Sequence, residues 1–197
     1  MNEKKFKEAI RTILTEIGED VNREGIKATP DRVCRLWKNL YYGYRKRLVV
    51  MNENKRNKQK LPDDVIPITV FKSISNDLLI RKVNFLSTCE HHLAQIHSGE
   101  CWVGIVPNQK LAGMNKIDKI VKYFAARLQI QEKMTCEIAD WINTNLEPLG
   151  VIVLIKANHL CAELQGDNGH FITSSARGIL LNNKDGVKDE FLSLIKT

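Results

Sequence analysis

Apolar residues recur three and four positions apart in several stretches, which is typical of amphipathic helices. Near the N-terminus this spacing begins at Phe6 and ends at Ile17, and Gly18 is a plausible stop. A further helix is expected to start at Thr29-Pro30, with Thr29 as the cap and Pro30 at the first helical position. The sequence predicts helices over residues 6–17, 30–45, 115–128, 130–147 and 184–196.

Alternating apolar and polar residues predict strands between these helices, and the alternation is clearest from Ile80 to Phe85. The sequence predicts strands over residues 65–73, 78–86, 94–106, 151–160 and 171–181. Three strands, two helices and two more strands favour an α+β fold with a mainly antiparallel sheet. Two cysteines, Cys101 in a strand and Cys136 in a helix, are expected to lie in the core.

The order of the elements suggests three parts along the chain. Residues 1–47 form an N-terminal helical extension, residues 48–64 a polar linker, and residues 65–197 the catalytic domain. The basic run from Lys55 to Lys60 lies in the linker and has no aromatic residues between its charges. A solvated linker is therefore a better interpretation of this run than a nucleic-acid site.

Composition narrows the class of protein. With 43% hydrophobic and 27% charged residues, the 197-residue chain is typical of a soluble globular protein. Its longest aliphatic run, Val151 to Ile155, is too short to span a membrane, and the charged start, Met1 to Lys5, is unlike a signal peptide. Five cysteines without paired spacing favour a reducing cytoplasm. A net charge of +7 calls for an anionic partner, and a polyphosphate substrate fits better than nucleic acid.

The chemistry concentrates in two short segments, Cys89-Glu90-His91-His92 and His159-Leu160-Cys161. On an extended strand, His159 and Cys161 would leave the same face. A catalytic zinc site takes three protein ligands, and Cys89, one of the adjacent histidines and Cys161 would supply them. The chain must then turn between Cys89 and His92. A structural zinc site is the alternative, but it would need a fourth ligand and usually shows C-x-x-C spacing.

Cys89-Glu90-His91-His92 followed by His159-x-Cys161 resembles the GTP cyclohydrolase I family. The resemblance extends to four other segments, namely residues 28–32, 116–117, 129–132 and 190–192. It implies the tunnelling fold, in which subunits join their sheets into a barrel and active sites lie between subunits. The expected assembly is a homo-oligomer, a decamer of two pentameric rings.

In that family, zinc-activated water attacks C8 of the guanine ring of GTP, formate leaves, and the sugar rearranges to give dihydroneopterin triphosphate. This product is a pterin precursor of tetrahydrofolate biosynthesis. The resemblance assigns Zn²⁺ to Cys89, His92 and Cys161, and proton transfer to His91 and His159, with Glu90 ranked below them. It assigns binding of the purine nucleotide to Gln131, Glu132, Lys116, Lys119, Asn115, Arg32, Arg35 and Gln165.

Four positions depart from the family pattern. Asn115 replaces a usual serine and Lys119 a usual arginine, while Gln165 stands where an arginine normally contacts the triphosphate and Glu163 adds a negative charge nearby. Three hypotheses follow. The chain makes the pterin precursor from GTP, or it acts on another purine nucleotide or stops at a formamidopyrimidine product, or it is a non-catalytic paralogue that binds nucleotide.

Overall fold

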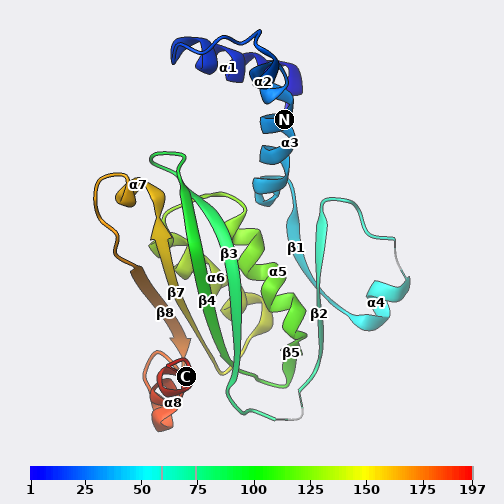
Figure 1. Ribbon diagram of the computed structural model, residues 1–197. Helices are drawn as coiled ribbons and strands as arrows, with labels where there is room; N and C mark the ends of the chain where they lie inside the picture. The colour runs from blue at the N-terminus through cyan, green and yellow to red at the C-terminus, as the bar shows by residue number, and fades with distance from the viewer. Residues whose placement is uncertain (59, 74, 197) are drawn as a thin grey trace. The chain divides into compact units, whose positions relative to one another are not determined.

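The computed structural model describes residues 1–58, 60–73 and 75–196 (Figure 1). Gln59, Ile74 and Thr197, which belong to the predicted linker and catalytic domain, lie outside the described residues. The chain divides into two compact units, Met1–Tyr42 and Gly43–Thr197. Among the described residues, no helix has both the length and the apolar character needed to cross a membrane.

The first unit consists of helices α1 (Glu3–Glu16), α2 (Glu24–Lys27) and α3 (Thr29–Leu40). Aromatic rings join α1 to α3, since the centroids of Phe6 and Trp37 are 5.2 Å apart. Pro30 lies in the first turn of α3 as predicted, but the cap is Ala28 rather than Thr29, and no side chain caps the helix. The helix also ends at Leu40 and not near Arg45, because a 3-10 turn, η1 (Tyr42–Tyr44), follows.

The second unit is organised around a five-stranded sheet. Its strands are β3 (Leu79–Cys89), β4 (Gln95–Val106), β7 (Gly150–His159), β8 (Phe171–Gly178) and the short β6 (Leu128–Gln129). Their order in the sheet is β6-β3-β4-β7-β8, and all pairs are antiparallel except β3 with β6. The predicted α+β class and the mainly antiparallel sheet are confirmed, while β6 was not predicted.

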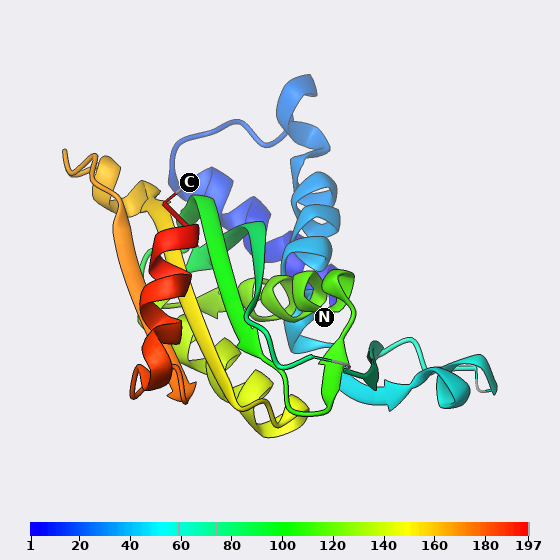
Figure 2. The same cartoon turned by 90° about the horizontal axis from the view of Figure 1, so that it is seen from below.

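Helices cover both faces of this sheet. Helices α5 (Met114–Ala125) and α6 (Gln131–Leu146) pack on one face, where they bury residues such as Ile120 and Ile138 completely. On the other face, η2 (Lys184–Gly186) and α8 (Val187–Leu194) follow β8, and Phe191 is fully buried against the strands. Figure 2 shows α8 and α6 on opposite sides of the strands. The sheet is therefore held from two sides, with the larger core under α5 and α6.

A second, three-stranded sheet corrects the predicted linker. Its strands are β1 (Arg47–Asn52), β2 (Val65–Lys72) and β5 (Lys110–Ala112), and β1 runs parallel to β2. Residues 48–52 are thus a strand and not a linker, because the apolar run from Leu48 to Met51 packs beside β2 and against the core. The basic run that follows is partly helical, as α4 (Glu53–Lys58). The predicted division of the chain into three parts, with boundaries after residues 47 and 64, stays a prediction.

Of the two cysteines expected in the core, only one lies there. Cys101 is fully buried, and burial raises the pKa of its thiol far above the usual value. Cys136 is exposed on α6, so the prediction for that residue is wrong. Cys136 lies on the exposed side of α6, whereas Met134 and Ile138 lie on the buried side.

Candidate metal centre and active site

The segment from Cys89 to His92 forms the tight turn that the sequence required. Strand β3 ends at Cys89, whose N–H donates to the carbonyl of Ala94 at 2.8 Å, and the N–H of Glu90 donates to Gln129 on β6 at 3.1 Å. Leu93 adopts a left-handed backbone with φ of 52°, a conformation that costs energy for a residue with a side chain. The chain therefore reverses immediately after the strand, and Cys89 and His92 approach each other.

Cys161 reaches the same region by a different route from the predicted one. Strand β7 ends at His159, and Cys161 lies in α7 (Leu160–Glu163), a single helical turn. The expectation that His159 and Cys161 leave one face of a continuous strand is therefore wrong. The backbone changes from strand to helix at Leu160, so the two-residue alternation of a strand does not extend to Cys161.

Cys89, His92 and Cys161 form a group that could hold a metal ion. Their ligand atoms all lie within 4.8 Å of one another, and Cys89 Sγ is 3.9 Å from His92 Nδ1. In a tetrahedral zinc site, a sulfur and a nitrogen ligand are about 3.6 Å apart, so the donor types and spacing fit Zn²⁺. Burial and the neighbouring Cys89 thiol raise the pKa of Cys161, because two negative charges at this distance repel each other.

His91 lies beside this group. Its Nδ1 is 4.0 Å from Cys89 Sγ, and its ring centroid is 6.3 Å from that of His92. The imidazole of His91 is exposed, so it can exchange protons with solvent or with a bound molecule. Of the two adjacent histidines, the structure groups His92 with the cysteines and leaves His91 next to them.

His159 is held by Gln131, a contact that the sequence did not indicate. His159 Nε2 is 2.9 Å from Gln131 Oε1, and its ring packs edge-on against Phe171. Burial lowers the pKa of His159, the charge of Glu132 opposes this shift, and His97 adds to it. Among the described residues, these contacts favour a neutral imidazole beside the metal group.

The side-chain amide of Gln131 is hydrogen-bonded to groups inside the protein. The residue is only 3% exposed, and its Nε2 donates towards Ile155 O on β7 and towards Phe171 O and Thr173 Oγ1 on β8, at 3.0–3.2 Å. Since the amide nitrogen faces three acceptors, Oε1 must accept the proton on His159 Nε2. Purine binding by Gln131 stays a prediction, whereas its hydrogen bond with His159 is a finding.

The two acidic candidates lie at the surface. Glu132 is exposed at the start of α6, close enough to His159 for its charge to act on the imidazole. Glu90 is also exposed and faces Lys133 of α6, with 3.9 Å between carboxylate and ammonium. Glu132 is accessible to a ligand, whereas Glu90 already has a weak ionic partner.

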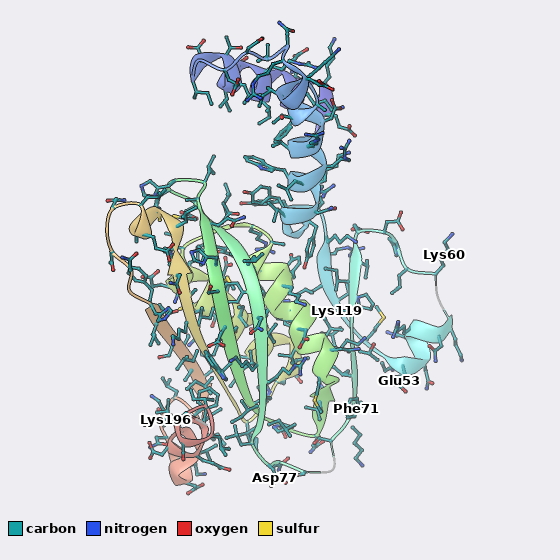
Figure 3. The ribbon with its side chains drawn as sticks, in the orientation of Figure 1. Glu53, Lys60, Phe71, Asp77, Lys119 and Lys196 are labelled. Atoms are coloured by element: carbon teal, nitrogen blue, oxygen red, sulfur yellow. The ribbon has the colours of Figure 1, made fainter. Side chains whose placement is uncertain are left out.

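The basic candidates on α5 differ in burial. Lys116 is only 6% exposed although it lies off the apolar stripe of the helix, while Lys119 is half-buried and Asn115 is exposed. Burial lowers the pKa of Lys116, and the charges of Lys119 and Arg56 add to this effect. Figure 3 labels Lys119 on α5, the helix that packs beside β2. Arg56, from the basic run taken as a linker, thus joins a cationic group that the sequence did not reveal.

Two candidate arginines belong to the first unit. Arg32 and Arg35 are exposed on α3, and they stay predicted phosphate ligands.

Gln165 is exposed just after α7, and its Nε2 donates to the carbonyl of Cys161 at 2.8 Å. The neighbouring Glu163 accepts hydrogen bonds from within the chain, so its charge is not simply free in solution.

Fold and site together define an α+β protein with a three-ligand Cys₂His group, the kind that catalytic metal sites use. The family description GTP cyclohydrolase I matches residues 6–196 of the chain. "GTP cyclohydrolase 1" of Campylobacter jejuni (strain RM1221) is 38% identical over 99% of this chain and 96% of the relative. The proteins of the same name from Aquifex aeolicus (strain VF5) and Helicobacter pylori (strain G27) are both 37% identical, over 100% and 92% of this chain and 98% and 94% of the relatives.

The chain therefore belongs to the GTP cyclohydrolase I family and is an enzyme. The match covers the metal group, both histidines beside it and the basic helix α5. It supports GTP cyclohydrolase activity for this chain.

Proposed function

We propose that this protein is a zinc-dependent GTP cyclohydrolase I, which opens the imidazole ring of GTP, releases formate and gives dihydroneopterin triphosphate. The observation that carries this proposal is the convergence of Cys89, His92 and Cys161 within 4.8 Å, with two further histidines at hand. A three-ligand site leaves a coordination position for a reactant, which a purely structural site does not need.

Zn²⁺ would be held by Cys89 Sγ, His92 Nδ1 and Cys161 Sγ. When bound, zinc acts as a Lewis acid that makes water a usable nucleophile near neutral pH. The half-buried Cys161 and the buried Cys89 shield one side of the group, while the exposed His92 leaves the other side open to substrate.

His159 and His91 would move the protons of the reaction. His159 donates its Nε2 proton to Gln131, so its Nδ1 carries the free lone pair and can accept a proton. His91 is exposed and 4.0 Å from Cys89, a position from which it can deliver a proton to the opening ring. The two imidazoles thus serve as base and acid around one reacting carbon.

Glu132 would recognise the guanine. A carboxylate accepts two N–H bonds, which matches the N1 and exocyclic amine of guanine. Its exposed position near His159 would bring the purine C8 towards the metal group. Gln131 contributes by holding His159, and its buried amide supports this indirect role.

The triphosphate would bind the cations of α5 in a site completed by a second copy of the chain. Ser87, two residues before Cys89, donates its hydroxyl proton to the carbonyl of Ala125, so the C-terminal end of α5 lies near the metal group. Lys116 lies near the opposite end of this helix, about 13 Å from Ala125 along the helix axis. His91, His92 and Glu132 are exposed in a single chain. Both observations favour active sites between subunits, as the resemblance implies.

We expect a large homo-oligomer, with the ten-chain assembly of two pentameric rings as the specific prediction. Light scattering at assay concentration measures this directly. A monomer that is fully active at that concentration would contradict a shared active site. The cytoplasmic location and the supply of a folate precursor are further parts of the proposal.

Product analysis tests the reaction. Zinc-loaded protein is incubated with GTP, dGTP, GMP and guanosine, and formate and the purine-derived product are measured by mass spectrometry. GTP should yield formate and dihydroneopterin triphosphate. A formamidopyrimidine product, or turnover of another nucleotide instead, would favour a divergent enzyme. No formate from any of the four would favour the non-catalytic paralogue.

Replacing Gln165 with arginine should tighten GTP binding about tenfold, because one charge-assisted phosphate contact is worth about 1.4 kcal/mol or more. The residue is exposed, and its side-chain amide donates to the Cys161 carbonyl, which an arginine can also reach. Calorimetry on GTP, GMP and guanosine measures the effect, with Gln165→Met as the uncharged control. Unchanged GTP affinity in Gln165→Arg would show that this residue does not face the phosphates.

A further inference from the structure

All five histidines of the chain lie in the region around the metal group, and the proposed function uses only three of them. The other two, His97 and His170, enter a polar network with Asn158 and Glu163. Glu163 Oε2 is 3.0 Å from His97 Nε2, and Glu163 Oε1 accepts from Asn158 Nδ2 at 3.0 Å. His170 Nδ1 lies 2.5 Å from Asn158 Oδ1.

Glu163 is the last residue of α7, the helical turn that carries Cys161. Helices this short are marginal on their own, so a single turn depends on contacts with its surroundings. Inside the turn, Leu164 N–H donates to Leu160 O at 3.0 Å, and Gln165 Nε2 donates to Cys161 O at 2.8 Å. The two oxygens of Glu163 then tie the turn to His97 on β4 and to Asn158 on β7.

An irregularity in β4 aims His97 at this carboxylate. The pairing of β4 with β7 shifts register between His97 and Glu100, and Ser98 adopts a left-handed backbone with φ of 50°. Such bulges bend a strand and redirect a side chain, at a cost in backbone energy. Ser98 Oγ lies 3.3 Å from His97 Nδ1, so the imidazole is held on both sides.

We propose that Glu163 is a positioning residue for the metal group. Together with His97 and Asn158 it forms a clamp that fixes α7 and thereby directs Cys161 Sγ towards Cys89 and His92. The inference deepens the proposed function and rests on it, because it requires that Cys89, His92 and Cys161 bind a metal ion. It also gives a role to a position where the resemblance indicated only a departure from the family.

Partial burial of the pair distinguishes the clamp from an ordinary surface contact. Exposed ion pairs often contribute little, because water competes for both partners. The side chains of His97 and Glu163 are only 30% and 23% exposed, and both carboxylate oxygens have a partner within the chain. Supporting contacts around metal ligands commonly change metal affinity by about ten- to a hundredfold.

The first measurement is Zn²⁺ affinity by competition with a chelator, without nucleotide. Glu163→Ala should weaken Zn²⁺ binding about tenfold or more. Glu163→Gln should retain most of the affinity, since its oxygen can accept from Asn158 while its amide meets the other tautomer of His97. Glu100→Ala is the matched control, because it removes a carboxylate that pairs with Lys82 on the same sheet, and its affinity should equal that of wild type.

The second measurement is the absorption spectrum of the Co²⁺-substituted protein, whose sulfur-to-metal charge-transfer band reports the thiolates bound. Glu163→Ala should lose part of this intensity as Cys161 leaves the metal. His97→Phe keeps an aromatic ring at this position but removes the hydrogen-bonding nitrogens, and it should cause the same loss. The double variant should lose little more than either single variant, because both act through one contact.

Wild-type Zn²⁺ affinity and an unchanged Co²⁺ spectrum in both Glu163→Ala and His97→Phe would overturn the clamp. Should Glu163→Ala fail to fold, the Zn²⁺ affinity and the Co²⁺ spectrum of His97→Phe decide whether the clamp exists. A wild-type chain that binds no Zn²⁺ would reject both the clamp and the metal site. Normal clamp effects in a protein that releases no formate would reject the proposed reaction alone.

Discussion

Cys161→Ser will abolish both Zn²⁺ binding and formate release. The remaining pair, Cys89 and His92, offers too few ligands to compete with water, and a serine hydroxyl does not ionise to replace the thiolate. Metal content after dialysis and formate production from GTP measure the two losses. Cys89→Ser and His92→Ala should behave in the same way.

Cys136→Ser provides the control for this experiment. Cys136 is a thiol exposed on α6, so its replacement should leave the zinc content and the rate unchanged. Full zinc occupancy in Cys161→Ser would remove Cys161 from the ligand set. The metal would then have to be held by Cys89, His92 and a ligand outside the helical turn α7.

His91→Ala and His159→Ala should separate metal binding from turnover. Each variant should keep about one Zn²⁺ per chain and lose activity by about 10²–10⁴-fold, the usual contribution of a positioned acid or base. Neither imidazole belongs to the metal group, although His91 is only 4.0 Å from Cys89. Zinc content and single-turnover formate release, measured on the same samples, test this.

The same variants can reveal an error in the assignment. Loss of zinc from His91→Ala would mean that the adjacent histidines exchange roles. Normal turnover in His159→Ala would mean that another group accepts the proton. Gln131→Leu, which removes the hydrogen bond to His159, should lower the rate less than His159→Ala does, because the imidazole itself remains.

The turn from Cys89 to His92 could be predicted because both residues had to reach one ion from the end of a strand. The turn at Cys161 could not, since Glu163 of α7 bonds both to Asn158 at the end of the preceding strand and to His97 on the distant strand β4. Strand β6 has only two residues, too few for a periodic pattern, yet it fixes Glu90 through the carbonyl of Gln129. Local sequence carries no signal for contacts of these kinds.

Two other differences between the sequence interpretation and the structure also have physical causes. The apolar run from Leu48 to Met51 carried a strand signal, but the basic residues after it favoured a linker for the whole segment. Lys116 lies off the apolar stripe of α5, and nothing in the sequence indicated that the structure would bury it. Burial of one charged side chain depends on how the neighbouring elements pack, which periodicity does not describe.

Through the side-chain amide of Gln131, the tautomer of His159 depends on whether the outer strand of the sheet, β8, is paired with β7. Two of the three acceptors that hold the amide nitrogen, Phe171 O and Thr173 Oγ1, belong to β8. If β8 separates from β7, the amide loses these partners and is free to rotate by half a turn, which would present its nitrogen to His159 and favour the opposite tautomer. Nitrogen chemical shifts of His159 would therefore register whether the last strand of the sheet is in place.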